Sequence, residues 1–147
     1  MSEIIKTKAI CIKKIDYGDS SKIATLYTAE FGKISVIIKS GRNKNSKIGA
    51  IVDIFNLIDI VYYNKNNRSI QLLTQADLID FFQNIKSDIE LLKYATAILE
   101  LFNEIIHEGE SNSLLFAGLH KILVLLNKKS ESPQVLFIKF LVFIKEL

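Results

Sequence analysis

The stretch Lys33-Ile34-Ser35-Val36-Ile37-Ile38-Lys39 decides the fold class of the N-terminal part of this 147-residue chain. Its even-numbered residues are all apolar and share one face of a strand, because successive strand side chains point to opposite sides. The other face carries Lys33, Ser35 and Lys39. This alternation, in β-branched residues, is typical of a half-buried strand. The stretch therefore predicts a strand with an apolar inner face and a basic outer face.

Similar alternation extends from the start of the chain to about Ala76, and the segments between the alternating runs are rich in Gly, Asn, Asp and Ser, which favour turns. Five strands are predicted: Lys6–Asp16, Lys22–Thr28, Lys33–Ser40, Asp53–Tyr63 and Ser69–Asp77. Five short strands expose edges that would pair with other chains unless something covers them. Closure into a small barrel removes those edges, so we expect a barrel.

From about Ser87 the apolar residues recur at intervals of three and four, which indicates helices. Ser87 and Glu90 have the spacing of a capping box, which predicts a helix start there, and Gly109 is placed to end that helix. We expect its buried stripe to consist of Ile89, Leu92, Thr96, Leu99, Phe102 and Ile106. The first helix is thus predicted to run from a cap at Ser87 to a stop at Gly109.

Two more helices are predicted after Gly109. One spans Asn112 to Asn127, with a buried stripe of Leu115, Leu119, Ile122 and Leu126. The other begins at Ser132-Pro133, with the serine as N-cap and the proline at the first helical position. Residues 135–144 are apolar on nearly every side, so this helix is expected to be buried all round, by another chain or by residues beyond Leu147.

The expected fold class is therefore α+β, with a five-stranded barrel domain over residues 1–80 and an all-α domain of about three helices over residues 81–147. Residues 1–80 hold twelve Lys and Arg against eight Asp and Glu, whereas residues 81–147 hold seven against eight. A polyanionic partner therefore belongs with the barrel. The apolar stretch from Val135 to Leu147 is shorter than the ~20 residues of a membrane span, so no membrane contact is expected.

Catalytic and metal-binding motifs are missing from the sequence. One cysteine, Cys11, and two histidines, His107 and His120, cannot build a closed zinc site or a disulfide framework. Residues 41–47 superficially resemble a phosphate-binding loop, but they lack its second glycine and its Ser or Thr after the lysine, and no convincing helix follows. We therefore expect no enzyme activity, no cofactor and no metal.

A family resemblance begins at residues 16–34, which read Asp-Tyr-Gly-Asp-Ser-Ser-Lys-Ile-Ala-Thr-Leu-Tyr-Thr-Ala-Glu-Phe-Gly-Lys-Ile. Together with the basic stretch Lys39-Ser40-Gly41-Arg42, they resemble the opening of the RecO family of recombination mediators. That family typically has a Tyr-Gly-Glu turn, a strand ending in Leu-Tyr-Thr, a Phe-Gly-Lys turn and then a Lys-Gly-Ala-Arg-like stretch. Residues 53–58, 72–79 and 108–112 resemble later segments of the family in the same order.

The resemblance implies an N-terminal OB-fold and a helical domain. It also implies a cytoplasmic, nucleoid-associated bacterial protein that binds single- and double-stranded DNA and anneals complementary strands. With the partner RecR, such a protein would help the RecA recombinase to replace single-strand-binding protein. Family members usually continue with a four-cysteine zinc module that this sequence does not contain, so the helical domain is expected to be incomplete.

If the barrel is an OB-fold, DNA is expected to lie across its exposed strand face and the adjoining loops. The candidate phosphate contacts are Lys33, Lys39, Arg42, Lys44 and Lys47. Five contacts with single-stranded DNA predict a slope of about −3.5 in log K against log salt. Tyr62 and Tyr63 could stack bases, although strand alternation points one of them into the core.

Two alternatives stay open at this point. The helical part could be an adaptor that docks the acidic, apolar C-terminal tail of single-strand-binding protein in a groove bordered by Lys121, Lys128 and Lys129. The barrel could also bind RNA, because phosphate contacts and base stacking tolerate either sugar.

Overall fold

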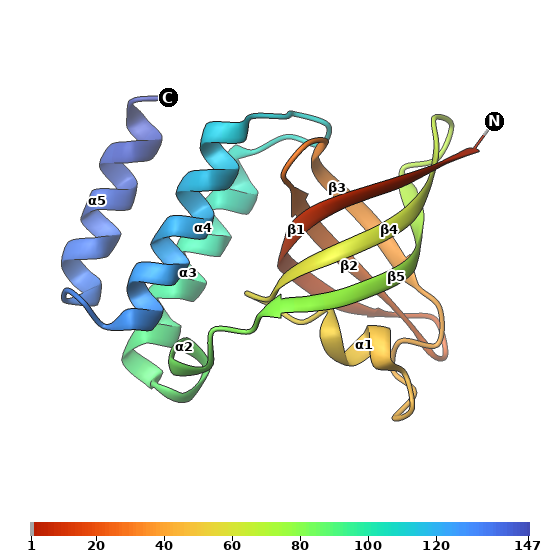
Figure 1. Ribbon diagram of the computed structural model, residues 1–147, viewed down its shortest axis with the longest axis horizontal. Helices are drawn as coiled ribbons and strands as arrows, with labels where there is room; N and C mark the ends of the chain where they lie inside the picture. Colours follow the sequence, from red (N-terminus) through yellow and green to blue (C-terminus); the bar gives the residue numbers. More distant parts are fainter. Residues whose placement is uncertain (1) are drawn as a thin grey trace. The chain divides into compact units, whose positions relative to one another are not determined.

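Across residues 2–147, which the structure describes, the computed structural model contains five strands and five helices (Figure 1). The strands are β1 (Ser2–Tyr17), β2 (Ser21–Thr28), β3 (Gly32–Ile38), β4 (Leu57–Lys65) and β5 (Ile70–Asp80). The helices are α1 (Lys47–Ile51), α2 (Gln83–Ser87), α3 (Ile89–Ile105), α4 (Ser113–Lys128) and α5 (Pro133–Lys145). Contacts divide the chain into two units: the strands with α1 and the turn Glu108–Ser111, and the remaining four helices.

The five strands close into a barrel in the order β1-β2-β3-β5-β4, which confirms the predicted barrel. Closure depends on the length of β1, whose first half pairs with β4 and whose second half pairs with β2. Ala9 and Ile10 pair with both neighbours, and the β1–β2 register shifts just after them, between Cys11 and Lys13. Every pairing is antiparallel except that of β3 with β5, which covers only Ser35–Ile37.

The inner face of β3 is the one that the alternation predicts. Val36 and Ile38 are buried in the barrel core, and Ile34 packs against it. Cys11 is fully buried in the same core, together with Leu26, Ile58 and other apolar residues of the remaining strands. The outward residues of β3, Lys33, Ser35 and Ile37, are half-buried.

The expected start of the fourth strand at Asp53 is wrong, because a short helix and a turn precede the strand. Helix α1 follows the loop of residues 41–46, so the expectation that no helix follows this loop is also wrong. Its N-cap is Ser46, whose hydroxyl accepts a hydrogen bond from the Gly49 N–H at 3.0 Å. Ile48 and Ile51 pack against the barrel core. Five residues are too few to show helical periodicity, which explains the omission.

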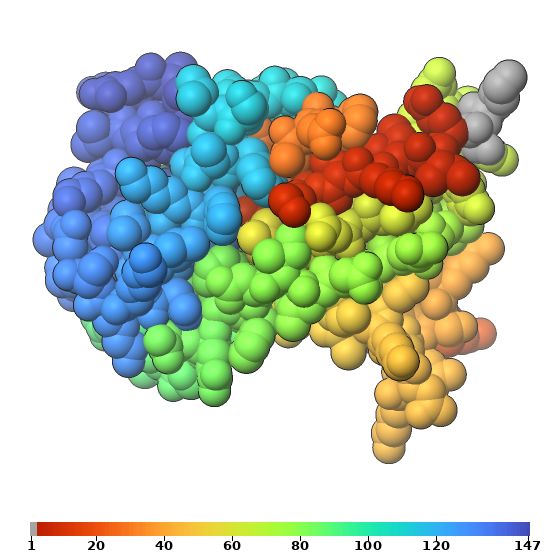
Figure 2. All heavy atoms as spheres, in the orientation of Figure 1, coloured from red at the N-terminus to blue at the C-terminus, as the bar shows by residue number. Residues whose placement is uncertain are grey.

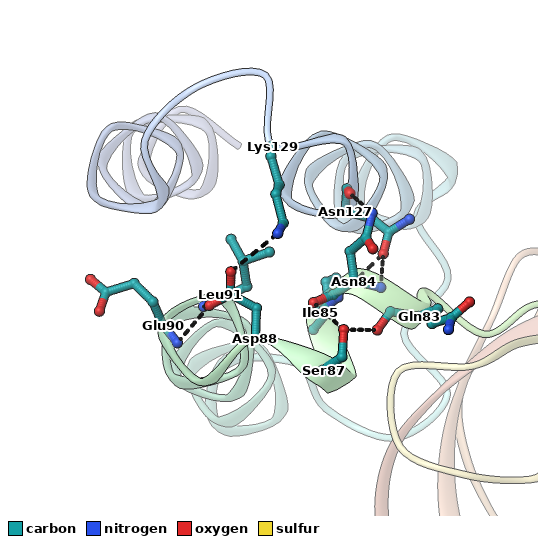
Figure 3. A network of polar contacts seen from close by, with 9 residues as sticks. All are labelled: Gln83, Asn84, Ile85, Ser87, Asp88, Glu90, Leu91, Asn127 and Lys129. Carbon is teal, nitrogen blue, oxygen red and sulfur yellow. Dashed lines mark hydrogen bonds and ion pairs between the residues drawn. The ribbon is translucent and has the colours of Figure 1, made fainter.

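Helix α3 begins one residue later than the capping box predicts (Figure 3). Its N-cap is Asp88, whose carboxylate accepts the backbone N–H groups of Glu90 and Leu91. The Ser87 hydroxyl instead donates to the Gln83 carbonyl at 2.9 Å and so belongs to the end of α2. The sequence pattern did not reveal α2, and because the Ser87 hydroxyl is bonded within that helix, Asp88 caps α3 instead.

The buried face of α3 also differs from the predicted stripe. Leu99, Phe102 and Ile106 of the predicted stripe are buried, but so are Leu91, Ala95 and Ile98, whereas the predicted Ile89 is 85% exposed. The buried residues have the same spacing of three and four, but the stripe runs through an alanine that contributes little to a hydropathy pattern. The helix ends at Ile105, before the predicted stop at Gly109.

Helix α4 confirms the prediction closely. Asn112 is its N-cap and accepts the N–H groups of Leu114 and Leu115, and the four residues of the expected stripe are all buried. Near its end, the Asn127 amide oxygen accepts the N–H groups of Asn84 and Ile85, at 3.0 and 3.3 Å (Figure 3). Asn127 thereby satisfies the first turn of α2, which lacks a side-chain N-cap of its own.

Helix α5 begins as predicted, with Ser132 as N-cap and Pro133 in its first turn. Within the chain itself only Leu136 and Phe140 of this helix are buried, so its burial on the remaining sides stays a prediction. Ile138 is 60% exposed and Val142 is 51% exposed. Among the described residues, no helix has both the length and the hydropathy needed to cross a membrane.

Candidate nucleic-acid interface

The structure places four of the five candidate phosphate contacts on one segment. Lys39, Arg42, Lys44 and Lys47 lie between the end of β3 and the start of α1, in a segment that we call the basic segment (residues 39–47). It projects from the barrel surface as the orange to gold spheres at the lower right of Figure 2. Lys33 stands at the opposite end of β3, about 20 Å away at 3.3 Å per residue. The five candidates therefore do not form one cluster.

The three lysines of the basic segment are available to a ligand. Lys39, Lys44 and Lys47 are all exposed. Within residues 2–147, none of them forms a hydrogen bond or an ion pair through its ammonium group. Their charges are therefore open to solvent, as phosphate binding requires.

Arg42 has a different environment from its neighbouring lysines. Its guanidinium donates to the Gly18 carbonyl at 2.5 Å and forms an ion pair with Asp16 at 3.5 Å. Its backbone N–H donates to the Ser20 carbonyl at 3.0 Å. Arg42 therefore fastens the basic segment to the turn between β1 and β2, and its contact with phosphate stays a prediction.

The lowered pKa of Asp16 is consistent with its ion pair to Arg42. The hydrogen bond from Lys22, whose ammonium lies 3.2 Å from the Asp16 carboxylate, and the nearby Arg42 lower the pKa of Asp16 below its ordinary value. Asp16 is thus ionised and paired at neutral pH, and it does not oppose the open lysines with an unpaired negative charge.

Lys14 is a cation that the sequence reasoning did not single out. Its ammonium donates to the Gly49 carbonyl of α1 at 2.8 Å, and burial lowers the pKa of this side chain. Lys14 shares the inward face of the barrel with Ala24, its partner in the register. It therefore holds α1 in place.

The Lys33 end of β3 is covered by the turn Glu108–Ser111, which we call the acidic turn. The Gly109 N–H donates to the Lys33 carbonyl at 3.0 Å, and the Glu108 carboxylate accepts the Ser35 hydroxyl at 2.8 Å. Gly32 has a φ of +74°, and a Cβ there would overlap the Glu110 carbonyl. An acid thus lies beside Lys33, and its charge opposes an anionic ligand there.

The aromatic candidates separate as strand alternation predicts. Tyr62 is buried in the barrel core, whereas Tyr63 points outward and is 38% exposed. The structure adds Tyr17, at the end of β1 beside the turn that Arg42 fastens, with 52% exposure. Its place on the same face as Lys13 and Ile15 follows from alternation along β1, a signal that was present in the sequence.

The helical unit holds an apolar groove between α4 and α5 with a volume of about 620 Å³. Its lining includes Leu125, Phe140 and Phe143, with Lys121 among its polar residues. Three lysines are predicted to border such a groove, and only Lys121 lines it. Lys128 and Lys129 lie outside the groove, and the Lys129 ammonium is 3.4 Å from the Asp88 carboxylate. Lys139 also lines the groove, but its ammonium is bonded to both carboxylate oxygens of Glu131.

Nothing in the described part of the chain resembles a metal centre, since no three or more His, Cys, Asp or Glu side chains are grouped to hold an ion. His107 is exposed beyond the end of α3, and His120 lies on α4. The charged groups of the barrel described above are of two kinds: cations bonded to backbone carbonyls, such as Lys14 and Arg42, and exposed lysines of the basic segment.

A closed five-stranded barrel with a basic surface segment, followed along the chain by a helical unit, defines an OB-type class of protein. Two family models match the chain: "Recombination protein O N terminal" over residues 1–82 and "Recombination protein O C terminal" over residues 86–144. The chain therefore belongs to the RecO family, as the resemblance of its motifs implies.

Curated relatives carry the name "DNA repair protein RecO". The protein of Chlorobium limicola is 38% identical over 140 residues, which cover 94% of this chain and 53% of the relative. That of Chlorobium phaeobacteroides (strain DSM 266) is 38% identical over 138 residues, with the same coverage. That of Chloroherpeton thalassium is 34% identical over 137 residues, or 93% and 53%. The chain spans about half the length of the curated relatives it matches.

Proposed function

We propose that this chain is a non-enzymatic DNA-binding and strand-annealing module of a recombination mediator that acts in DNA repair. Residues 1–80 bind single- and double-stranded DNA, and residues 81–147 provide contacts to protein partners. In this proposal the module works with RecR and helps RecA to displace single-strand-binding protein. It acts in the bacterial cytoplasm, where DNA binding associates it with the nucleoid. Support comes from the family membership and from the charge distribution of the barrel.

The observation that carries this proposal is the exposure of Lys39, Lys44 and Lys47 on a segment that Arg42 fastens to the barrel. Lysines that pair with phosphates release condensed counterions, and this release favours binding without regard to sequence. Annealing needs no catalytic group on this account. Two strands repel each other through their phosphates, and a module that neutralises phosphates on both strands lowers that repulsion.

The experiment is a fluorescence-anisotropy titration of a single-stranded oligonucleotide at two salt concentrations. The variant Lys39→Ala/Lys44→Ala/Lys47→Ala should bind more weakly, and its slope of log K against log salt should be shallower by about 2.1, or 0.7 for each lost contact. Lys33→Ala is the matched control, and it should retain the wild-type slope because the acidic turn covers that end of β3. Equal losses in both variants would contradict the proposed site.

A second candidate function is favoured by the groove between α4 and α5. An acidic, apolar peptide such as the C-terminal tail of single-strand-binding protein would place its apolar side chains against Phe140 and Phe143 and an acid near Lys121. The apolar contact would supply most of the affinity, and Lys121 would orient the peptide.

A fluorescent tail peptide titrated with the full chain tests this second function. Lys121→Glu should weaken peptide binding at least tenfold, because it places a like charge at the groove. Lys128→Glu carries the same charge change outside the groove and should bind as the wild type does. Equal binding by all three proteins would remove the groove as the docking site.

A further inference from the structure

The end of the barrel at which β1 begins holds a pocket with a volume of about 320 Å³, which we call the mouth pocket. The start of β1 and the end of β4, which pair with each other, form part of its wall (Figure 1). The start of β3 and the acidic turn form the remainder, together with the turn after β4. This volume is at the lower end of the range for ligand pockets, so the site suits one small group.

The mouth pocket contains the hydroxyl of a buried tyrosine. Tyr62 is 2% exposed, and its side chain belongs to the barrel core. Within residues 2–147 its hydroxyl has no hydrogen-bond partner. No fully enclosed polar side-chain atom of this part of the chain lacks a partner, so the hydroxyl oxygen opens into the pocket that Tyr62 lines. A hydroxyl in this position is free to bond a group that enters the pocket.

A carboxylate lies on the same side of the strands as this hydroxyl. Glu3 points to the same side of β1 as the buried Ile5, whose register partner on β4 is Tyr62. Burial raises the pKa of Tyr62, and the negative charge of Glu3 raises it further. The hydroxyl is therefore protonated at neutral pH and can accept a hydrogen bond. Two acceptor oxygens, one of them charged, favour a ligand that donates hydrogen bonds.

The other charged groups of the lining are already engaged. Lys33 forms a bridge with Glu108, whose carboxylate accepts a serine hydroxyl, and the Arg68 guanidinium donates to the Tyr63 carbonyl at 3.4 Å. Of the charged residues that line the pocket, Glu3 alone has no bond to another group in the described part of the chain. Its negative charge repels an anion and attracts a cation, so the mouth pocket selects a cation.

The apolar part of the lining indicates which kind of cation fits. Ile5 is buried, Ile34 packs against the barrel core, and Phe31 is 40% exposed. These side chains suit a hydrocarbon stem that ends in an ammonium group, and the face of an aromatic ring attracts the same charge. A divalent metal ion instead takes about six oxygen ligands and gains nothing from apolar walls.

We propose that the mouth pocket binds an alkylammonium group, whose charged head contacts the Glu3 carboxylate and the Tyr62 hydroxyl. The hydrocarbon stem lies against Ile5, Ile34 and the ring of Phe31. Two sources offer this group: a free polyamine and a lysine side chain of another protein. The site is at the start of β3, whereas the basic segment follows the end of that strand, so the two sites bind independently.

The first test uses the wild-type chain and two probes of the same length and opposite charge, butylammonium chloride and sodium butyrate, at equal ionic strength and without DNA. At ten times its Kd, butylammonium should raise the Tm by about 4 °C, because a ligand that binds only the folded state stabilises it. Butyrate should leave the Tm unchanged. A larger shift with butyrate, or no shift with either probe, overturns the inference.

The second test removes the two contacts one at a time. Tyr62→Phe deletes only the hydroxyl, so the Tm without ligand should stay as in the wild type, while the affinity for butylammonium falls about fivefold. Glu3→Gln keeps the shape and removes the charge, and should weaken binding about tenfold. The matched controls are Tyr17→Phe and Glu104→Gln, both at exposed positions outside the pocket, which should bind as the wild type does. Wild-type affinity in both pocket variants overturns the inference.

A third comparison separates the two sources. Spermidine, the methylamide of N-acetyl-lysine and the methylamide of N-acetyl-arginine are titrated against the full chain. Tighter binding of spermidine would identify a free polyamine, and tighter binding of the lysine derivative would identify a side chain of another protein. Both results agree with the inference. A preference for the arginine derivative over both amines would assign the pocket to a guanidinium and overturn it.

Discussion

The two ends of β3 carry similar sequence signals but have opposite surroundings. At its start, Lys33 lies beneath the acidic turn, with Glu108 bonded to Ser35. Past its end, Lys39 and the rest of the basic segment are exposed, and the one arginine there fastens the segment to a neighbouring turn. The difference teaches that a lysine on an outward strand face is open to a ligand only if no other segment covers it.

The cause of this asymmetry is the pairing of β3. Its parallel partner β5 reaches only Ser35–Ile37, so the backbone at Lys33 has no strand beside it on that side. The acidic turn pairs with the backbone there through a short parallel bridge between Lys33 and Glu108. An unpaired strand edge is costly to leave open, and this barrel covers it with an acidic segment.

The largest expected effect concerns the covered end. Gly32→Ala should lower the free energy of unfolding by about 3 kcal/mol, because the new Cβ meets the Glu110 carbonyl and an L-residue is strained at a φ of +74°. Gly109→Ala is the control: it has a φ of +78° with open space around it, and should cost about 1 kcal/mol. Urea unfolding measures both, and equal costs would contradict the tight contact of the acidic turn with β3.

The next effect concerns the open end. Arg42→Ala should lower the free energy of unfolding by about 1 kcal/mol, since the Gly18 carbonyl and Asp16 both lose a partner. Lys44→Ala removes an exposed side chain from the same segment and should stay within about 0.5 kcal/mol of the wild type. The same unfolding experiment compares them, and a larger loss for Lys44→Ala would reverse the assigned roles.

A smaller effect connects the two ends through DNA affinity. Glu108→Gln removes a negative charge beside Lys33 and keeps an oxygen that can accept the Ser35 hydroxyl. Single-stranded DNA should bind about twofold more tightly at low salt, and the gain should fade at high salt as screening increases. Glu100→Gln, on the exposed side of α3, makes the same change as a control. A gain that persists at high salt would argue against a charge effect.

The smallest effect is a pH dependence at the open end. The lowered pKa of Asp16 means that its pairing contributes stability above the ordinary carboxyl pKa, and that this part is lost as pH falls through the lowered value. The Tm of the wild type should therefore drop more between pH 5 and about pH 2 than the Tm of Asp16→Asn. Asp19→Asn, in the turn that follows β1, should follow the wild type. Identical drops for all three proteins would show that the pairing of Asp16 contributes nothing measurable.

Much of the fold follows from local patterns. The alternation in β3, the stripe of α4 and the Ser132 cap of α5 each have one local interpretation, and the structure confirms them. The start of α3 has two possible local interpretations, because Ser87 and Asp88 are both good N-cap residues. The choice depends on α2, whose Gln83 carbonyl takes the Ser87 hydroxyl. A five-residue helix leaves no periodic signal, so sequence alone could not decide.

The candidate site was predictable in composition but not in arrangement. Lys39, Lys44 and Lys47 lie together because they are near in sequence. The surroundings of Lys33 depend on its bridge to Glu108, some 75 residues later in the chain, and no local sequence pattern predicts that contact. The role of Arg42 likewise depends on the Gly18 carbonyl, which a hydropathy pattern does not show.

The burial of Cys11 gives the barrel a built-in chemical reporter. Its thiol is the only one in the sequence and is fully enclosed by the barrel core. A thiol-alkylating reagent can reach it only when the barrel unit opens, whereas unfolding of α2–α5 alone leaves the core around it in place. The rate of alkylation under native conditions therefore measures how often the barrel opens, and it can be followed with DNA present to see whether binding slows that opening.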